Sequence, residues 1–347
     1  MRILGIETSF DDTGVAIYDS DLGLLINKLF HQSNIHYKYG GVVPELAARE
    51  YVHQVAPLIK SILQKENILS SIDGIAYTGG PGLSGSILVG AAVSCSLAYS
   101  CNIPSIPIHH MEGHLLSVML EKRKPQFPFV ALLVSGKHTQ LIDVCSFGDY
   151  KILGETLDDA VGEVFDKVAQ KLNLGYPGGA LLSQFAKIGK LRNLNFPKPM
   201  KYHMNLDFSF SGLKTFTMNL IHKHFNDKNI LHDIAFGFED SVFDVLSYKS
   251  FQALKLTGYN KLVVAGGVSS NQKLIFKLKN MLKKYNKKLY FSRSEFCTDN
   301  AAMIAYVGML YLKRGWPITN NIFVNPKWSI LDIKKTYSNF YNVSDIL

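Results

Sequence analysis

The chain has 347 residues, of which 47% are hydrophobic and 19% charged, so it is long enough for two globular domains and too apolar to be intrinsically disordered. Its formal net charge of +9 permits a polyanionic partner such as nucleic acid, although a chain rich in Lys and Asn becomes basic without any such function. None of the four cysteines forms a Cys-x-x-Cys pair, which indicates reduced core residues in a cytoplasmic protein rather than a disulfide framework.

The first half of the chain begins with a predicted β-hairpin. Residues 3–8 and 14–18 are apolar runs around the polar turn Ser9–Thr13. A later apolar strand, 75–80, ends in glycines before a helix. The uncharged stretch that includes it, Gly74 to Ile108, contains a glycine turn and many serines, which favours a buried strand and helix over a membrane span. Helical patterns lie near 44–66, 84–100 and 110–120.

The second half repeats this order. Residues 129–135 and 139–145 form another predicted hairpin around Gly136–His138, and 262–267 is another strand that ends in glycines. Further helical patterns, predicted to form an insertion, lie near 158–173, 178–188, 211–225 and 231–257. The alternation of strands and helices indicates the α/β class. Paired glycine turns and helix N-termini are suited to gripping a nucleotide, as in actin and the sugar kinases.

A histidine pair in the stretch HHMEGH, residues 109–114, is a candidate metal site. In a helix, His110 and His114 lie one turn apart on one face, while Glu112 points away from them. A zinc protease instead has the glutamate directly after the first histidine, so the protease reading fails on geometry. The pair alone leaves metal binding and metal-free packing equally open.

Asp299 is a candidate third ligand. It precedes the apolar helix that starts at Ala301, where an aspartate commonly stabilises the helix N-terminus. The same position also suits a carboxylate ligand. Two histidines and one carboxylate with open positions fit iron or zinc.

Many motifs together resemble one family, the TsaD family of tRNA N6-adenosine threonylcarbamoyltransferases, formerly classed as O-sialoglycoprotein endopeptidases. The matching stretches are GIETSFDDTGVAI (5–17), YGGVVPELAARE (39–50), GGPGLSGS (79–86), HHMEGH (109–114), LVSGKHTQL (133–141), TLDDAVGEVFDKVA (156–169), YPGG (176–179), FSFSGLKT (208–215), AGGVSSN (265–271) and CTDNAAMIAY (297–306). The resemblance implies a duplicated actin-like fold of the sugar-kinase and heat-shock ATPase type with two lobes. We expect lobes at 1–125 and 126–347, with the helical insertion near 158–257 and a C-terminal segment that can return to the first lobe.

The resemblance also implies the site residues. It makes His110, His114 and Asp299 the ligands of one Fe²⁺ or Zn²⁺ ion. The residues implied to contact the threonylcarbamoyl adenylate are Leu133, Val134, Ser135, Gly136, Lys137, Asp166, Gly179 and Asn271. Without the resemblance, Asp166 reads as a solvated helix residue and Asn271 as a helix-start residue.

The implied reaction moves a threonylcarbamoyl group from threonylcarbamoyl-AMP to N6 of the adenosine beside the anticodon, in tRNAs that read codons starting with adenine. The implied partners are tRNA, the TsaB and TsaE proteins and a TsaC-type synthase that supplies the adenylate. The alternative function is an ATPase or small-molecule kinase of the same fold, for which Asp11 or Asp12 could activate a hydroxyl.

Three positions depart from the family pattern. Phe10 stands where the family usually has Cys, and Tyr51 where His is common; neither is expected to touch the metal ligands. Lys137 replaces a glycine of the usual SGGHT turn, which removes backbone freedom and adds a charge.

Two basic segments are candidates for contact with tRNA. The first, 187–228, interleaves eight Lys or Arg residues with aromatic residues, of which we expect the phenylalanines to lie in the core. The second, 273–293, has eight Lys or Arg residues and no acidic residue, and it reads equally well as a solvated helix face.

Overall fold

The computed structural model describes residues 1–10, 12–32, 39, 41–63, 71–190, 194–315 and 321–341, without the side chains of 340 and 341. Asp11, Arg192 and the last three residues of the predicted helix 44–66 therefore lie outside the described residues. The chain forms two compact units, Met1–Arg123 with the described part of Thr298–Leu347, and Lys124–Cys297. The expected lobe boundary at 125 lies two residues from Arg123, and the segment after Cys297 joins the first unit.

Each unit contains one five-stranded sheet, and the two sheets have the same topology. The strand order is β3-β2-β1-β4-β5 in the first unit and β8-β7-β6-β9-β10 in the second. In both units the first three strands of the unit are antiparallel neighbours, and the later strands pair in parallel. The repeat predicted from the two hairpins is therefore a duplicated α/β fold.

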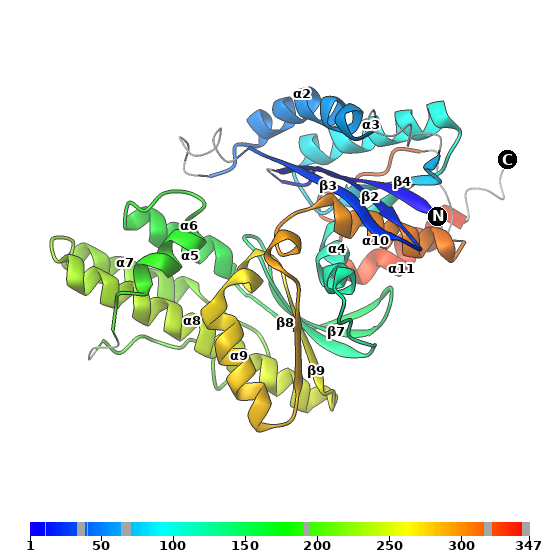
Figure 1. The fold of residues 1–347 in the computed structure, drawn as a ribbon. Helices are drawn as coiled ribbons and strands as arrows, with labels where there is room; N and C mark the ends of the chain where they lie inside the picture. Colours follow the sequence, from blue (N-terminus) through cyan, green and yellow to red (C-terminus); the bar gives the residue numbers. More distant parts are fainter. Residues whose placement is uncertain are drawn as a thin grey trace. The chain divides into compact units, whose positions relative to one another are not determined.

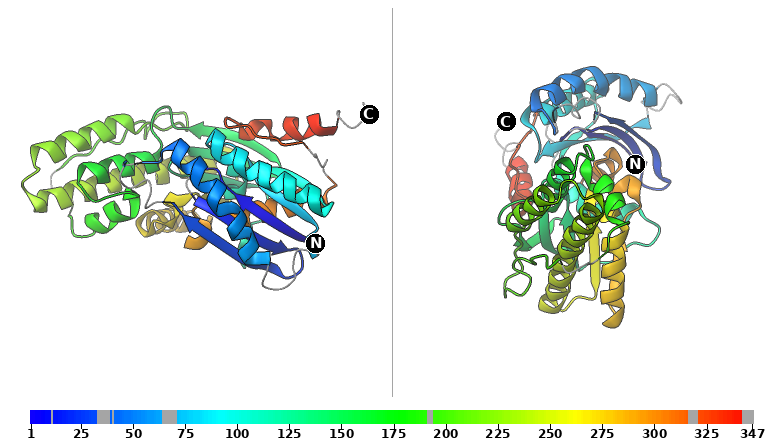
Figure 2. Two further views of the ribbon diagram at one scale, coloured as in Figure 1. Left: turned by 90° about the horizontal axis from the view of Figure 1, so that it is seen from above. Right: turned by 90° about the vertical axis from the view of Figure 1, so that its left-hand side faces the viewer.

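The first sheet carries helices on both of its faces, as Figure 1 shows, with α2 and α3 on one side and α10 on the other. Figure 2 shows α2 and α3 running side by side across the sheet. Because both faces are covered, β1 and β4 are almost wholly buried. The elements of this unit are β1 (Arg2–Glu7), β2 (Asp12–Asp19), β3 (Gly23–His31), α2 (Pro44–Leu63), β4 (Gly74–Gly80), α3 (Ser84–Cys101), β5 (Ser105–His109), α4 (His110–Leu116), the 3₁₀ helix η3 (Ser117–Leu120), α10 (Ala301–Lys313), the 3₁₀ helix η6 (Ile330–Asp332) and α11 (Ile333–Tyr341).

The second unit is built around a core of strands and five helices. Its central strand β6 is completely buried, and the long helix α8 packs on β6, β7 and β9. Asp227 caps the start of α8, and Gly258, in the left-handed region with φ 72°, ends it. The elements are β6 (Phe129–Val134), β7 (Thr139–Ser146), β8 (Asp149–Glu155), α5 (Val161–Lys171), α6 (Gly178–Ala186), α7 (Ser211–Lys223), α8 (Lys228–Thr257), β9 (Lys261–Ala265), the 3₁₀ helix η4 (Gly267–Ser270), α9 (Gln272–Lys284), β10 (Lys288–Phe291) and the 3₁₀ helix η5 (Ser294–Phe296).

Helix α3 is the one described helix with the length and apolar composition of a membrane span. It packs against α2 and β4, and its buried residues include the small residues Gly90 and Ala91. The core helix of a water-soluble domain passes the same test of length and composition. These contacts match the buried strand and helix expected for the uncharged stretch Gly74 to Ile108.

Helix α10 approaches its neighbours unusually closely at positions that lack a side chain. A Cβ atom on Gly5 of β1 would lie 2.5 Å from the carbonyl oxygen of Ala301, and one on Gly308 would lie 2.3 Å from Cβ of Ala76. Gly113 of α4 also faces α10, where a Cβ atom would lie 3.0 Å from Cγ of Met303. The start of α10 is therefore held against both the first strand and the histidine helix.

We predict that Gly5→Ala destabilises the protein by roughly 1–3 kcal/mol, because the added methyl group overlaps backbone atoms of α10 that cannot rotate away. Chemical denaturation of the purified variant measures this change. Gly212→Ala is the matched control, because nothing lies within 4 Å of the added methyl group and alanine favours the helix. Equal stability of the two variants would contradict the close approach of α10.

Candidate metal centre and donor-binding residues

The histidine stretch lies where a strand passes directly into a helix. Strand β5 ends at His109, and α4 starts at His110. His109 caps this helix, since its Nδ1 accepts the backbone N–H of Met111 at 3.2 Å, and its Nε2 lies 3.0 Å from the carbonyl oxygen of Trp328. His109 therefore has a structural role, and the next turn of helix carries the two candidate ligands.

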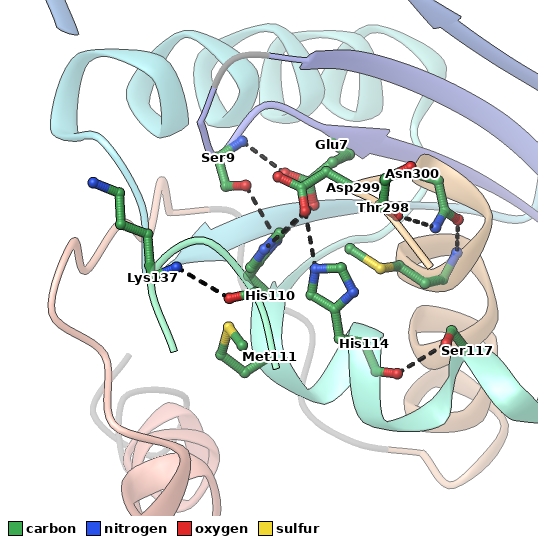
Figure 3. A network of polar contacts seen from close by, with 12 residues as sticks. Glu7, Ser9, His110, Met111, His114, Ser117, Lys137, Thr298, Asp299 and Asn300 are labelled. Atoms are coloured by element: carbon green, nitrogen blue, oxygen red, sulfur yellow. Dashed lines mark hydrogen bonds and ion pairs between the residues drawn. The ribbon is translucent and has the colours of Figure 1, made fainter. Parts of the chain in front are cut away.

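The side chains of His110, His114 and Asp299 converge on one point (Figure 3). Oδ1 of Asp299 lies 2.9 Å from Nε2 of His114 and 3.5 Å from Nε2 of His110. One ligand atom from each residue lies within 4.8 Å of the other two. The helical geometry deduced from the spacing thus holds, and the distant carboxylate completes the set.

Asp299 does not cap helix α10. That role belongs to Asn300, whose Oδ1 accepts the backbone N–H of Met303 at 3.0 Å. The Asp299 side chain is consequently available to point at the histidines. Of the two readings of this position, the structure favours the ligand over the helix cap.

Glu112 faces away from the ligand group. Both of its carboxylate oxygens accept from the hydroxyl of Tyr311 at 2.8 Å, and the side chain is completely buried. A protease of the zinc type needs this carboxylate beside the metal as its general base. The structure therefore confirms that the protease reading fails.

The pKa values of His110 and Asp299 are shifted strongly in opposite directions. Burial lowers the pKa of His110, but the nearby carboxylates of Glu7 and Asp299 outweigh burial and raise the pKa to about 10. Burial opposes ionisation of Asp299, yet His110 and His114 hold its pKa well below the usual range. The carboxylates of Glu7 and Asp299 thus favour positive charge at this position, as a divalent cation would supply.

The donor set fits such a cation. Two neutral imidazole nitrogens and one carboxylate oxygen are ligands common to iron and zinc, and they leave coordination positions open for a substrate. The histidines are almost fully buried, whereas Asp299 retains 21% of its side-chain exposure. A metal held here would be accessible from the Asp299 side.

Sequence reasoning missed Glu7, which lies beside this centre. Its Oε2 is 3.1 Å from Nδ1 of His110, and its side chain is completely buried. The signal was present, because Glu7 ends the apolar strand β1, where an ionisable group needs a specific partner.

The predicted donor-binding turn connects β6 and β7 in the second unit. The backbone N–H of Ser135 donates to the carbonyl of His138 at 2.9 Å, and Oγ of Ser135 accepts from the N–H groups of Lys137 and His138. The N–H of Gly136 makes no hydrogen bond within the described chain. Gly162, at the start of α5, approaches Gly136 so closely that a Cβ atom would lie 2.7 Å from its Cα.

Asp166 and Gly179, two further residues predicted to contact the adenylate, lie next to each other in the second unit. Oδ1 of Asp166 accepts the backbone N–H of Gly178 at 2.7 Å, and the N–H of Gly179 also points to this carboxylate at the start of α6. Burial raises the pKa of Asp166, and the two backbone donors oppose that rise. Asp166 is thus not a simple solvated helix residue.

Asn271 caps helix α9 and uses all of its hydrogen-bonding groups. Its Oδ1 accepts from the backbone of Lys273 and Leu274, while its Nδ2 donates to Oγ of Ser183 at 2.7 Å and to Oε1 of Glu239 at 3.1 Å. A substrate contact through this amide would have to replace one of those bonds. Its role as a substrate residue stays a prediction.

The family comparison decides the identity of the fold and its class of activity. The family model described as "TsaD: tRNA N6-adenosine threonylcarbamoyltransferase" matches residues 23–306. The chain belongs to the TsaD family. The family description is that of a transferase that modifies tRNA, and the group formed by His110, His114 and Asp299 could hold a metal ion.

Solved structures with similar folds confirm the actin-like duplication. HypF from T. kodakarensis aligns with a TM-score of 0.60 and 15% identity, over 93% of this chain and 49% of HypF. A full-length HypF in a phosphate- and nucleotide-bound form aligns with a TM-score of 0.57 and 14% identity, over 90% of this chain and 56% of the other. This chain therefore spans about half the length of the HypF chains that it matches.

A third solved structure matches almost end to end. The activator of 2-hydroxyisocaproyl-CoA dehydratase from Clostridium difficile, with bound ADPNP, has a TM-score of 0.54 and 11% identity, over 91% of this chain and 97% of the activator. At such low identities these likenesses concern the fold alone.

One departure from the TsaD pattern, Phe10, lies beside the candidate metal centre. The expectation that Phe10 does not touch the ligands is wrong, because its ring packs edge-on against His110 with 5.3 Å between ring centroids. Phe10 and its neighbour Ser9, in the turn after β1, therefore both contact the ring of His110. Tyr51 is buried and donates its hydroxyl to the backbone carbonyl of Asp12 at 2.9 Å.

The third departure, Lys137, carries no backbone strain. The non-glycine residues with positive φ in the described chain are Asn102, Asn173, Met200 and Asn286, so Lys137 keeps an ordinary backbone conformation. The freedom that a glycine would supply is not used at this position in the turn.

We predict that Lys137→Gly leaves the transfer rate within tenfold of wild type, because the turn keeps its geometry and loses only one exposed charge. A transfer assay with tRNA and threonylcarbamoyl-AMP measures the effect. Lys122→Gly, at another exposed lysine in a bend, is the control. Complete loss of transfer by Lys137→Gly alone would mean that the turn has been rebuilt around the lysine.

Asp12 gives the first unit a pH dependence. Burial raises its pKa from 3.8 to about 6, Asp299 and Glu7 add to that rise, and His31, with Nδ1 at 2.9 Å, opposes it. Because the folded-state pKa lies above the unfolded value, the folded protein binds this proton more tightly. Stability from this group is therefore present below about pH 4 and lost as the pH rises through 6.

We predict that Asp12→Asn gains stability relative to wild type, by up to roughly 3 kcal/mol, as the pH rises from about 4 to 6 in metal-free protein. Urea denaturation of both proteins across this range measures the difference. Asp332→Asn, at an exposed aspartate, should show no such trend. A constant difference between Asp12→Asn and wild type would refute the raised pKa.

Proposed function

We propose that the protein transfers the threonylcarbamoyl group of threonylcarbamoyl-AMP to N6 of the adenosine beside the anticodon, in tRNAs that read codons starting with adenine. The products are N6-threonylcarbamoyladenosine and AMP. The observation that carries the proposal is the convergence of His110, His114 and Asp299 in a chain of the TsaD family. The proposed cytoplasmic setting fits the four cysteines, which are all unpaired.

In the proposed reaction the N6 amine of adenosine, a weak nucleophile, attacks the carbonyl carbon of the carbamoyl group. The N6 lone pair forms a bond to the carbamoyl carbon, the bond from that carbon to the phosphate oxygen breaks, and AMP leaves with the electron pair while N6 loses a proton. A bound Fe²⁺ or Zn²⁺ ion would supply Lewis-acid polarisation and orientation of the donor. The protein's own contribution is to hold the reacting groups in place and exclude water.

The residues of the second unit are suited to hold the adenylate. The N–H of Gly136, which makes no hydrogen bond within the described chain, is an available donor for the phosphate of the leaving AMP. The carboxylate of Asp166, on α5, accepts backbone N–H groups at the N-terminus of α6, where Gly179 lies. A ribose hydroxyl could form a further hydrogen bond to this carboxylate. We propose that Leu133, Val134, Ser135, Lys137 and Asn271 complete this site.

The two basic segments offer fewer free charges to tRNA than their sequence suggests. Lys198, Lys201 and Lys277 contact Asp244, and Lys273 contacts Glu239 and Asp240. Phe208 and Phe210 are completely buried, as expected for core residues. The exposed Lys187 and Lys190 are the better candidates for phosphate contacts.

We predict that Lys187→Glu with Lys190→Glu weakens tRNA binding and reduces the steepness of its salt dependence, because phosphate contacts release counterions. Filter binding over a salt series measures both. The control is the double variant Lys122→Glu with Lys124→Glu. Both lysines are exposed, and they lie on either side of the boundary between the units at Arg123. Unchanged affinity of the first variant would exclude this surface.

The function itself is tested in cells depleted of this protein. We predict that N6-threonylcarbamoyladenosine disappears from digested tRNA and that wild type restores it, whereas Asp299→Asn restores less than about a tenth, because the ligand set is broken. Mass analysis of tRNA nucleosides measures the modified base. Glu295→Gln, at an exposed carboxylate paired with Arg293, should restore the wild-type level.

Two outcomes would argue against the proposal. If N6-threonylcarbamoyladenosine persisted in tRNA after depletion of this protein, the proposed transfer reaction would be ruled out. Phosphoryl transfer to a small molecule, without any change in tRNA, would instead select the actin-like kinase or ATPase. The proposed partners TsaB, TsaE and a TsaC-type synthase are tested by adding each to the purified transfer reaction.

A further inference from the structure

The carboxylate of Glu7 is fixed on every side by its neighbours in the first unit (Figure 3). Its Oε1 accepts the backbone N–H of Ser9 at 2.7 Å. Its Oε2 accepts the hydroxyl of Thr78 at 2.6 Å and lies 3.1 Å from Nδ1 of His110. Because both oxygens are occupied, Glu7 cannot turn to become a metal ligand without breaking these bonds.

The two candidate histidine ligands differ in this respect. Nδ1 of His110 faces Glu7 and also lies 3.1 Å from Oγ of Ser9. Nδ1 of His114 is buried and has no hydrogen-bond partner among the described residues. One ring is thus held by a carboxylate behind it, and the other is held by its packing and its contact with Asp299.

We propose that Glu7 is a positioning residue that fixes the tautomer of His110 and thereby raises the affinity of the metal centre. This inference rests on the proposed metal centre of the transferase. Glu7 accepts the proton on Nδ1, so Nε2, the nitrogen that faces Asp299, is the one that gives up its proton when a metal binds. Ser9 and Thr78 hold the carboxylate in the orientation that this requires.

Charge supports the same assignment. A divalent cation at this centre would be neutralised by two carboxylates, the partly exposed Asp299 in contact and the buried Glu7 behind His110. A buried charge is costly unless it is paired and hydrogen-bonded. Glu7 is therefore better matched to the loaded centre than an uncharged residue would be.

The test variant is Glu7→Gln, which preserves size and most contacts. The amide oxygen must face the N–H of Ser9, so the NH₂ group replaces Oε2 and points at Thr78 and His110. The hydroxyl of Thr78 can accept from it, but Nδ1 of His110 must then also accept. The ring proton moves to Nε2, where it blocks coordination.

The measurement is the dissociation constant for Zn²⁺ on the purified full chain, stripped with a chelator and titrated against a competing indicator without tRNA. We expect Glu7→Gln to bind Zn²⁺ about 10–100-fold more weakly than wild type. Glu112→Gln is the matched control, because it makes the same change at another fully buried carboxylate on the histidine helix, one that accepts from Tyr311. Wild-type affinity in Glu7→Gln would overturn the proposal.

A second measurement holds even if Glu7→Gln fails to fold. Nitrogen NMR of the histidine rings in the Zn²⁺-loaded wild-type protein should show the proton of His110 on Nδ1 and the metal on Nε2. A His110 ring bound through Nδ1 would overturn the proposal. Wild-type protein that binds no Zn²⁺ would overturn it through the metal centre, whereas failure of the nucleoside test with an intact centre would remove the reaction alone.

Discussion

The close packing of helix α10 against β1 and α4 is the constraint on which the candidate centre depends. Gly5 and Gly113 leave no side chain between these elements, so the start of α10 reaches the histidine helix. Asn300 then takes over the cap of α10, which releases Asp299 to face His110 and His114. The three candidate ligands therefore come together because the backbones of these elements pack closely.

Buried negative charge is the second organising feature of the first unit. Glu7, Asp12 and Asp299 come from different segments, and the pKa of Asp12 is raised while that of Asp299 is lowered. The difference follows from their partners, because burial dominates at Asp12 and two imidazoles compensate it at Asp299. A cation at this position would relieve repulsion that the metal-free protein relieves only with protons.

Sequence patterns were sufficient for the duplicated hairpins, the glycine turns and the main helices, since each has strong apolar periodicity. They did not indicate the outer strands β3, β5, β8 and β10; β10 has four residues and begins with an exposed lysine. The histidine pair followed from helical spacing, whereas the choice between cap and ligand at Asp299 needed the position of Asn300. The contacts of Phe10 and Glu7 with His110 join residues about a hundred positions apart, which no local pattern encodes.

The first unit is discontinuous, and this affects how the protein is made. His114 and Asp299 are 185 residues apart in the chain, and the whole of Lys124–Cys297 is synthesised between them. When synthesis has reached Arg123, Glu7 and both histidines are present in the chain. The third candidate ligand, Asp299, and helix α10, which covers one face of the first sheet, have not yet been made. A nascent chain therefore lacks the complete set of three candidate ligands until Asp299 has been synthesised, after the whole of the second unit.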